Sequence, residues 1–346
     1  MSLLQFGIQK MTTQTVSMQQ CFSWANEITR CQNYQALTYV FIELLKSFNW
    51  VDSACAYEIY GDRKKRTQAR HIASEILIRK LPLDFSAETG ENTYPFLNNR
   101  QLPEHIEIVT LAEKTKALLP VITDTGPDRV IVLEGVFNDE AVALLNHLLN
   151  LYHNQVILHD HKERDVLTRL PNRQSFDARL MEVCEFYQRA AFSKKTDDKL
   201  SWIAMLDIDH FKAVNDNFGH LYGDEVLLQF SQLMESRFRY IDFIFRFGGE
   251  EFVVILNRLT KYEAKNSLNR FRMAVEHYDF PLVGKVTVSI GATCIQDHHA
   301  LPIILLDRAD KALYFAKDNG RNQVVLFEDM IVTQRAVDHH SDIELF

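Results

Sequence analysis

Apolar residues recur along the chain at two periods, the three-to-four spacing of helices and the alternating or continuous pattern of strands. In the first half, helical spacing covers residues 12–30, 35–48 and 140–164, and strand-like runs cover 52–60 and 129–136. Residues 81–102 are rich in Pro, Asn, Thr and Gly, which predicts a loop. The pattern indicates two opening helices, a sheet and a long exit helix.

The second half follows a different order. An apolar strand at 201–206 ends in Asp207-Ile208-Asp209, and two strand-like runs flank Gly248-Gly249. The remaining predicted elements are helices at 173–190, 224–239, 261–277 and 303–317 and strands at 285–294 and 323–327. From residue 201 onward this is the β-α-β-β-α-β order of a ferredoxin-like core, with one added helix and strand. We expect an α/β (α+β) protein.

A chain of 346 residues is long enough for two domains. We predict a first domain at 1–160, a second at 161–330 and a tail at 331–346. Apolar residues of the exit helix alternate by three and four, which is typical of a coiled-coil seam: Val142, Leu145, Leu149, Tyr152 and Val156. We expect the first part of this helix to pack on its own domain and the last part to pair with a second copy. The alternative is an ordinary helix packed on its own sheet.

Composition excludes several classes of protein. A net charge of −8 and a pI near 5.9 argue against a protein that coats nucleic acid. The five cysteines form no zinc or disulfide pattern, which fits a reducing cytoplasm. The N-terminal residues lack a basic region followed by a long apolar core, and no window is apolar for long enough to span a bilayer. We therefore expect a soluble cytoplasmic protein without a membrane span.

Carboxylates gather near two predicted strand ends. Asp207 and Asp209 share a face at the end of a buried strand, and Glu250 and Glu251 follow two glycines that predict a two-residue hairpin turn with positive φ. Hard oxygen ligands at this density suit Mg²⁺. The alternative for each pair alone is a solvated strand end or hairpin.

The residues Gly248-Gly249-Glu250-Glu251-Phe252 resemble the signature of the GGDEF family of diguanylate cyclases, in its GGEEF form. Three further stretches resemble family motifs in the family's order: 165–173 (D-x-L-T-x-L-x-N-R), 207–220 (D-x-D-x-F-K-x-x-N-D-x-x-G-H) and 317–322 (K-x-x-G-R-N). The resemblance covers about 165–327. It implies a ferredoxin-like, nucleotidyl-cyclase palm that acts as a homodimer and condenses two GTP into cyclic di-GMP and pyrophosphate. The alternative is a degenerate domain that binds GTP or cyclic di-GMP only as a regulator.

The resemblance also implies roles for individual residues. Asp207, the carbonyl of Ile208, Glu250 and Glu251 would bind Mg²⁺ or Mn²⁺, with both glutamates catalytic. The substrate would be held by Phe211, Lys212, Asn215, His220, Asp224, Lys317 and Arg321. Among these, Asn215 and Asp224 would read guanine, and the three cations would meet the triphosphate. Helix capping is the alternative for Asp224, and a helix C-terminus answering its dipole is the alternative for Lys317 and Arg321.

Two regulatory features are expected. Arg239 and Asp242 match the family's R-x-x-D inhibitory site, with Arg270 as third member, so cyclic di-GMP would act as a feedback ligand. The alternative is a surface ion pair of little energetic consequence. The order and length of the first domain resemble a GAF-type sensory domain, with a PAS-type domain as the alternative. Its ligand or partner is not indicated by any motif.

Overall fold

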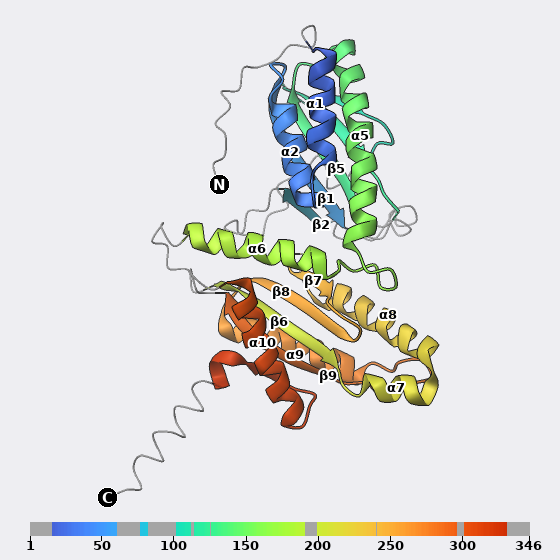
Figure 1. The fold of residues 1–346 in the computed structure, drawn as a ribbon, viewed down its shortest axis with the longest axis vertical. Helices are drawn as coiled ribbons and strands as arrows, with labels where there is room; N and C mark the ends of the chain where they lie inside the picture. The colour runs from blue at the N-terminus through green and yellow to red at the C-terminus, as the bar shows by residue number, and fades with distance from the viewer. Residues whose placement is uncertain are drawn as a thin grey trace, which may run out of the picture. The chain divides into compact units, whose positions relative to one another are not determined.

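The computed structural model describes residues 16–60, 77–81, 102–111, 114–124, 126–190, 199–239, 241–295 and 301–330 (Figure 1). The chain divides into two compact units, Met1–Lys162 and Glu163–Phe346, and each is described by itself. The predicted tail and most of the predicted loop at 81–102 lie outside the described residues. No helix among the described residues combines the length and the apolar character needed to cross a membrane.

The first unit is a five-stranded antiparallel sheet with helices packed on one face (Figure 1). The helices are α1 (Met18–Thr29), α2 (Tyr34–Lys46) and α5 (Asp139–Glu163). The strands are β1 (Val51–Tyr60), β2 (Leu77–Leu81), β3 (Glu107–Leu111), β4 (Lys114–Val121) and β5 (Asp128–Gly135), in the order β2-β1-β5-β4-β3. The three predicted helices and the two predicted strands are present. Strands β2, β3 and β4 were not predicted, because they are short or mix charged residues into weakly alternating runs.

Helix α5 serves the core of its own unit. Asn138 caps it, since its side chain accepts a hydrogen bond from the N–H of Ala141 (2.8 Å). The predicted seam residues Leu145, Tyr152 and Val156 are almost fully buried among residues of α1, α2 and the sheet. The seam pattern therefore reflects packing within the unit, as in the ordinary-helix interpretation, and these side chains leave no apolar surface for a second copy.

The second unit has a sheet of strand order β10-β9-β6-β8-β7. Its strands are β6 (Leu200–Ile208), β7 (Phe243–Arg246), β8 (Glu251–Leu259), β9 (Val288–Ile295) and β10 (Val324–Leu326). Strand β6 pairs antiparallel with both β8 and β9, and β10 adds parallel to β9. The predicted ferredoxin-like order is confirmed, and it places β6 at the centre of the sheet.

Helices cover both faces of this sheet. They are α6 (Arg173–Ala190), α7 (Phe211–Phe218), α8 (His220–Arg237), α9 (Lys261–His277) and α10 (Pro302–Asp318). On one face, the ring of Phe230 in α8 packs between two other rings. Its centre lies 4.7 Å from that of Phe252 in β8 and 5.3 Å from that of Phe271 in α9. On the other face α10 lies so close to β9 that a Cβ on Gly291 would sit 2.0 Å from the backbone nitrogen of Leu313.

The segment after β6 differs from its prediction. Residues 211–218 form helix α7 and α8 already begins at His220, where a loop up to residue 223 was expected. Gly219 separates the two helices with a φ of +88°, a conformation that glycine adopts without steric cost. Asp224 consequently lies inside α8, so helix capping, the alternative to its predicted role in reading guanine, is wrong.

Candidate active site

The end of the central strand carries a buried carboxylate. Asp207 lies near the end of β6, is 6% exposed, and its Oδ2 is 2.8 Å from Nζ of Lys317 at the end of α10. Burial raises the pKa of Asp207 above its ordinary value, and the charge of Asp209 adds to this despite the opposing charge of Lys317. The site therefore disfavours the charged form of Asp207 unless more positive charge is supplied.

The hairpin between β7 and β8 is wider than the predicted two-residue turn. The last register pair is Arg246 with Phe252, and the N–H groups of Phe247 and Gly248 both donate to the carbonyl of Glu251, at 2.8 Å and 3.1 Å. The described glycines with positive φ are Gly219, Gly284 and Gly320, so positive φ was also a wrong expectation for the pair at 248 and 249.

Close approach explains the first of the two hairpin glycines. A Cβ on Gly248 would lie 2.6 Å from Oε2 of Glu251, so a larger residue at 248 would make the Glu251 carboxylate move from the position in which it folds back over the turn. Glu251 itself begins β8 in register with Asp207. The hairpin thus presents its second glutamate beside the strand that carries the buried aspartate.

Glu250 joins the same acidic group. The N–H of Ile208 donates to its backbone carbonyl at 3.4 Å, which attaches the turn to the end of β6. Burial raises the pKa of Glu250, and the charges of Asp207 and Glu251 raise it further. Among the described residues, no group of three or more acidic, histidine or cysteine side chains is arranged to hold a metal ion. The donors nevertheless fit a hard divalent cation in kind, since they are oxygens whose mutual repulsion such a cation would relieve.

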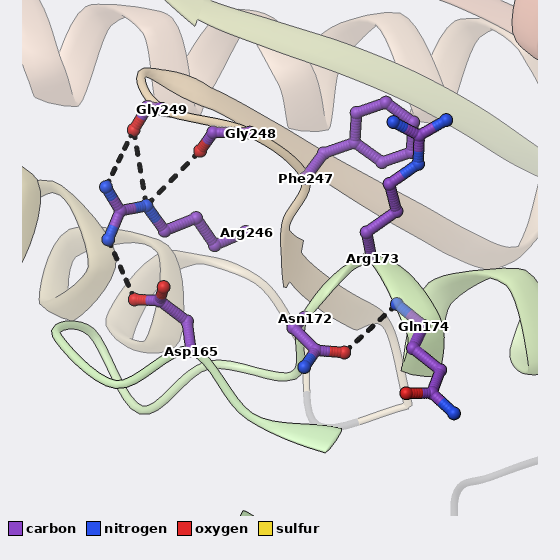
Figure 2. A pocket seen from close by; sticks show the side chains of 8 residues that line it. All are labelled: Asp165, Asn172, Arg173, Gln174, Arg246, Phe247, Gly248 and Gly249. Carbon is purple, nitrogen blue, oxygen red and sulfur yellow. Dashed lines mark hydrogen bonds and ion pairs between the residues drawn. The ribbon is translucent and has the colours of Figure 1, made fainter. Parts of the chain in front are cut away.

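Arg246 fixes the backbone of the turn, and no sequence motif had singled it out (Figure 2). Its guanidinium donates to the carbonyl of Gly249 at 2.8 Å and to that of Gly248 at 3.3 Å, and it forms an ion pair of 2.8 Å with Asp165. Burial works to raise the pKa of Asp165, but hydrogen bonds from Thr168 and Arg246 outweigh it and hold that pKa below its ordinary value. Arg246 therefore connects the motif at 165–173 to the hairpin through an ion pair and several hydrogen bonds.

The same residues line a cavity of about 420 Å³ beside the turn (Figure 2). Asn172 caps α6, with its side chain accepting from the N–H groups of Gln174 and Ser175 at 3.0 Å and 3.2 Å. The guanidinium of Arg173 lies 4.6 Å from the centre of the Phe247 ring. The cavity thus has a cationic, partly aromatic wall next to the glycine turn.

The predicted guanine-reading residues meet where α7 packs against α8. A Cβ on Gly223 would lie 2.0 Å from Oδ1 of Asn215 and 3.3 Å from the ring of Phe211, so glycine is needed for this contact. Phe211 is buried and Asn215 is half-buried, whereas Asp224, one residue beyond Gly223, is exposed. Lys212 and His220 are exposed as well. The structure brings Asn215 close to the start of α8 and leaves the two predicted readers accessible.

Two of the three predicted phosphate-binding cations lie at the end of α10, with Lys317 in its last turn and Arg321 in the loop that follows. Gly320, Arg321 and Asn322 all have positive φ, at 106°, 61° and 45°, and a glycine in this conformation is typical after a helix end. Arg321 is exposed, and its charge acts on Asp207. The backbone conformation agrees with the alternative interpretation of these residues as a helix C-terminus. That interpretation does not account for the ion pair between Lys317 and Asp207, because a cation can interact with the helix dipole without it.

The predicted inhibitory residues form an ion pair in which the aspartate is buried and the arginine is partly exposed. Nε and Nη2 of Arg239 donate to the two oxygens of Asp242 at 3.1 Å and 2.8 Å, and the Asp242 carboxylate is fully buried. Asp242 also accepts from the backbone N–H of Asn257 at 3.0 Å. Arg239 is 38% exposed, and Arg270 lies exposed on α9. Asp242 therefore holds the Arg239 side chain in place, and the two arginines present the accessible charge.

Comparison with known proteins covers the second unit. The family model described as "Diguanylate cyclase, GGDEF domain" matches residues 162–323. Diguanylate cyclase DgcP of Pseudomonas aeruginosa is 36% identical over 192 residues, which are 53% of this chain and 27% of that protein. Diguanylate cyclase A of Treponema denticola is 39% identical over 165 residues, which are 47% of this chain and 43% of that protein. The chain thus spans less than half the length of these curated relatives.

Solved structures give a similar result. The GGDEF domain of DgcB from Caulobacter crescentus, in complex with c-di-GMP, is 31% identical, with a TM-score of 0.44, and the match covers 48% of this chain and 96% of that one. Diguanylate cyclase SiaD in complex with its activator SiaC, from Pseudomonas aeruginosa, is 34% identical, with a TM-score of 0.47, covering 54% of this chain and 71% of that one.

Proposed function

We propose that this chain, whose residues 162–323 form a GGDEF domain, is a diguanylate cyclase that condenses two GTP molecules into cyclic di-GMP and two pyrophosphates. The observation that carries the proposal is the convergence of Asp207 and Glu250, both with raised pKa, beside Lys317. Carboxyl groups whose pKa is shifted and whose charge is incompletely neutralised are typical of functional sites. The degenerate alternative is not favoured, because the acids of the hairpin and of β6 are all retained.

Asp207, the Ile208 carbonyl, Glu250 and Glu251 would hold Mg²⁺ or Mn²⁺. When bound, such an ion stabilises charge on the attacking and leaving oxygens of a phosphoryl transfer. Lys317 already neutralises Asp207 in part through its ion pair of 2.8 Å, which supports a site that attracts positive charge. Arg246 contributes by keeping the two glycine carbonyls fixed, so that Glu250 and Glu251 are presented from a rigid turn.

The remaining residues would orient the substrate. Asn215 would offer a donor and an acceptor to a guanine edge, and Asp224 would accept two hydrogens. Phe211 lies beside Gly223, as Asn215 does, and would line the same site. A site with such bonds would reject adenine, because the polar groups that a bound base covers would be left unpaired. The triphosphate would be neutralised and oriented by His220 and by the three cationic side chains, which are those of Lys212, Lys317 and Arg321. Its α-phosphate would then face the 3′-hydroxyl of a second GTP.

Each domain would hold one GTP, so two copies would face each other about a two-fold axis. Leu145, Tyr152 and Val156 of α5 would not contribute to the pairing surface, because they are buried in their own unit. The first unit would act as a GAF-like sensory domain for an unknown ligand or partner. Cyclic di-GMP would bind Arg239 and Arg270, with Asp242 holding Arg239, and slow turnover by feedback.

The experiment is an assay of the full chain with GTP and Mg²⁺, with products separated by chromatography. Wild-type protein should form cyclic di-GMP, and Glu250→Gln and Glu251→Gln should lower its rate at least about a hundredfold with an unchanged fold. Asp310→Asn, which alters an exposed carboxylate of α10, serves as the matched control and should keep full activity. Robust product formation by both glutamine variants would refute the assignment of the hairpin acids.

A further inference from the structure

Asp209 makes contacts of a different kind from those of Asp207, although only Ile208 separates them. It is 5% exposed and faces no cation within ion-pair distance among the described residues. Its Oδ1 accepts from the Ser289 hydroxyl at 2.7 Å, and its Oδ2 accepts from the Thr287 hydroxyl at 2.7 Å and from the backbone N–H of Asn322 at 3.1 Å. The carboxylate is thus satisfied by hydrogen-bond donors from two separate parts of the chain.

The third of these donors belongs to an unusual loop. Gly320, Arg321 and Asn322 are successive residues with positive φ, and two of them are not glycine. L-residues avoid this conformation unless the surroundings impose it. The loop links α10, which carries Lys317, to β10, and it contains Arg321. The Gly320–Asn322 backbone therefore needs stabilising contacts if Arg321 is to face the acidic cluster together with Lys317.

The side chain of Asn322 supplies a second attachment. Its Oδ1 accepts from Nη1 of Arg272 at 2.8 Å, and its Nδ2 donates to Oε1 of Glu276 at 2.8 Å. Both partners lie on α9, whereas Asp209 follows β6. The backbone and the side chain of one loop residue are therefore held from two different elements, and the backbone contact comes from the segment that also carries Asp207.

We propose that Asp209 is a positioning residue of the reaction: it fixes the backbone of Asn322 and thereby sets the Gly320–Asn322 loop so that Arg321 reaches the triphosphate. The inference rests on the proposed function for the identity of the ligand. It assigns the two aspartates of the strand end to separate tasks. Asp207 belongs to the acidic cluster, and Asp209 organises the phosphate-binding loop without touching metal or substrate.

Two substitutions at this position separate positioning from ligation. In Asp209→Asn, the amide oxygen can replace Oδ2 and keep the bonds from Thr287 and Asn322, while the amide nitrogen donates to the Ser289 hydroxyl, which is able to accept. Asp209→Ala removes every acceptor. A residue that coordinates a cation would lose its function in both variants, because neutral amides and methyl groups both lack the charge.

Steady-state kinetics of the full chain should therefore split the two variants. Asp209→Asn should keep KM for GTP within about threefold of wild type, and Asp209→Ala should raise it at least about tenfold with a much smaller change in kcat, as expected for lost substrate binding. The Mg²⁺ concentration for half-maximal rate should stay unchanged in both. Asp307→Ala, which breaks the exposed pair with Lys311 on α10, is the control and should leave KM unchanged.

Two readouts without turnover complete the test. Calorimetry with a non-hydrolysable GTP analogue should show weakened binding only in Asp209→Ala, and amide exchange of residues 319–323 should accelerate in that variant alone. Equal loss in Asp209→Asn and Asp209→Ala, or wild-type behaviour of Asp209→Ala, would overturn the proposal. If the wild-type protein bound no GTP analogue, the proposed function would fail instead, and amide exchange would still decide whether Asp209 holds the loop.

Discussion

Each of the two units buries a carboxylate against a cation, and the surroundings of the two pairs differ. In the first unit, Arg129 of β5 and Asp160 of α5 are each 4% exposed and are joined by two hydrogen bonds of 2.6 Å and 2.8 Å. The Thr123 hydroxyl also donates to Asp160, and the guanidinium lies 4.3 Å from the centre of the Tyr34 ring. In the second unit, Lys317 is 32% exposed and meets Asp207 through a single contact.

The difference lies in charge balance. Asp160 has a bidentate partner of equal and opposite charge, so the pair adds no net charge to the core and holds the last turns of α5 on the sheet. Asp207 shares one lysine with Glu250, and both carboxyl groups have a raised pKa. A satisfied pair of this kind supports architecture, whereas an incompletely neutralised group is available to a ligand. Counting ion pairs alone would not have distinguished the two.

The largest expected effect is on the satisfied pair. Asp160→Asn leaves the buried charge of Arg129 without a counterion, and we expect the free energy of unfolding of the first unit to fall by about 3–5 kcal/mol. Denaturant unfolding followed by tryptophan fluorescence measures this, because Trp24 and Trp50 lie in the first unit and Trp202 lies in the second.

A double variant provides the control for this prediction. Arg129→Met with Asp160→Leu removes both charges and keeps apolar volume, so it should recover most of the lost stability, as apolar replacements of buried pairs often do. A double variant as unstable as Asp160→Asn would show that geometry, and not the uncompensated charge, is responsible.

Neutralising Asp207, which is incompletely neutralised in the native protein, should stabilise its unit, in contrast to the substitution of Asp160. The pKa of Asp207 is raised above 3.8 in the folded state, so its contribution to stability is fully present below pH 3.8 and is lost as the pH rises through the raised pKa. Asp207→Asn should therefore make the second unit more stable than wild type at pH 7, by less than the loss at Asp160, while it removes product formation. The difference in stability should disappear near pH 3.

Unfolding of both proteins as a function of pH, followed at Trp202, tests this sign. A second unit destabilised by Asp207→Asn at pH 7 would mean that the contact with Lys317 outweighs burial and the repulsion from Asp209. The two units would then differ only in degree, and the comparison between satisfied and available charge would fail.

The sequence predicted the second unit much better than the first. Its motifs lie at strand ends and helix ends, so the positions of Asp207, Glu250 and Lys317 followed once β6, the hairpin and α10 were identified. The ion pair of Arg246 with Asp165 and the hydrogen bonds of Asp209 could not be predicted, because the fold brings their partners together from positions distant in sequence. The width of the hairpin was missed for a similar reason, since the bond from Phe247 to the Glu251 carbonyl leaves no trace in residue type.

The first unit offered periodicity without motifs. Its long helices and its most apolar strand were predicted, and β3 and β4 were missed because lysine and glutamate interrupt their alternation. The buried pair of Arg129 and Asp160 was also missed. Charged residues are seldom fully buried, so a sequence pattern assigns them to the surface by default. Such a pair is visible only when the fold brings the two elements together.

The smallest expected effect concerns a neutral contact between two helices of the first unit. The hydroxyl groups of Tyr152 on α5 and Thr38 on α2 lie 2.8 Å apart, and the Tyr152 ring stacks on Phe41 at 4.3 Å. Tyr152→Phe removes one hydroxyl and keeps the stack, and Thr38 retains its bond to the backbone carbonyl of Tyr34 at 2.9 Å. We expect the first unit to lose about 1 kcal/mol or less, as for a single neutral hydrogen bond. Unfolding of both variants followed by fluorescence should show that Asp160→Asn loses several times more free energy of unfolding than Tyr152→Phe. A loss in Tyr152→Phe as large as that in Asp160→Asn would mean that the hydroxyl contact between α5 and α2 stabilises the unit as much as the ion pair between α5 and the sheet does.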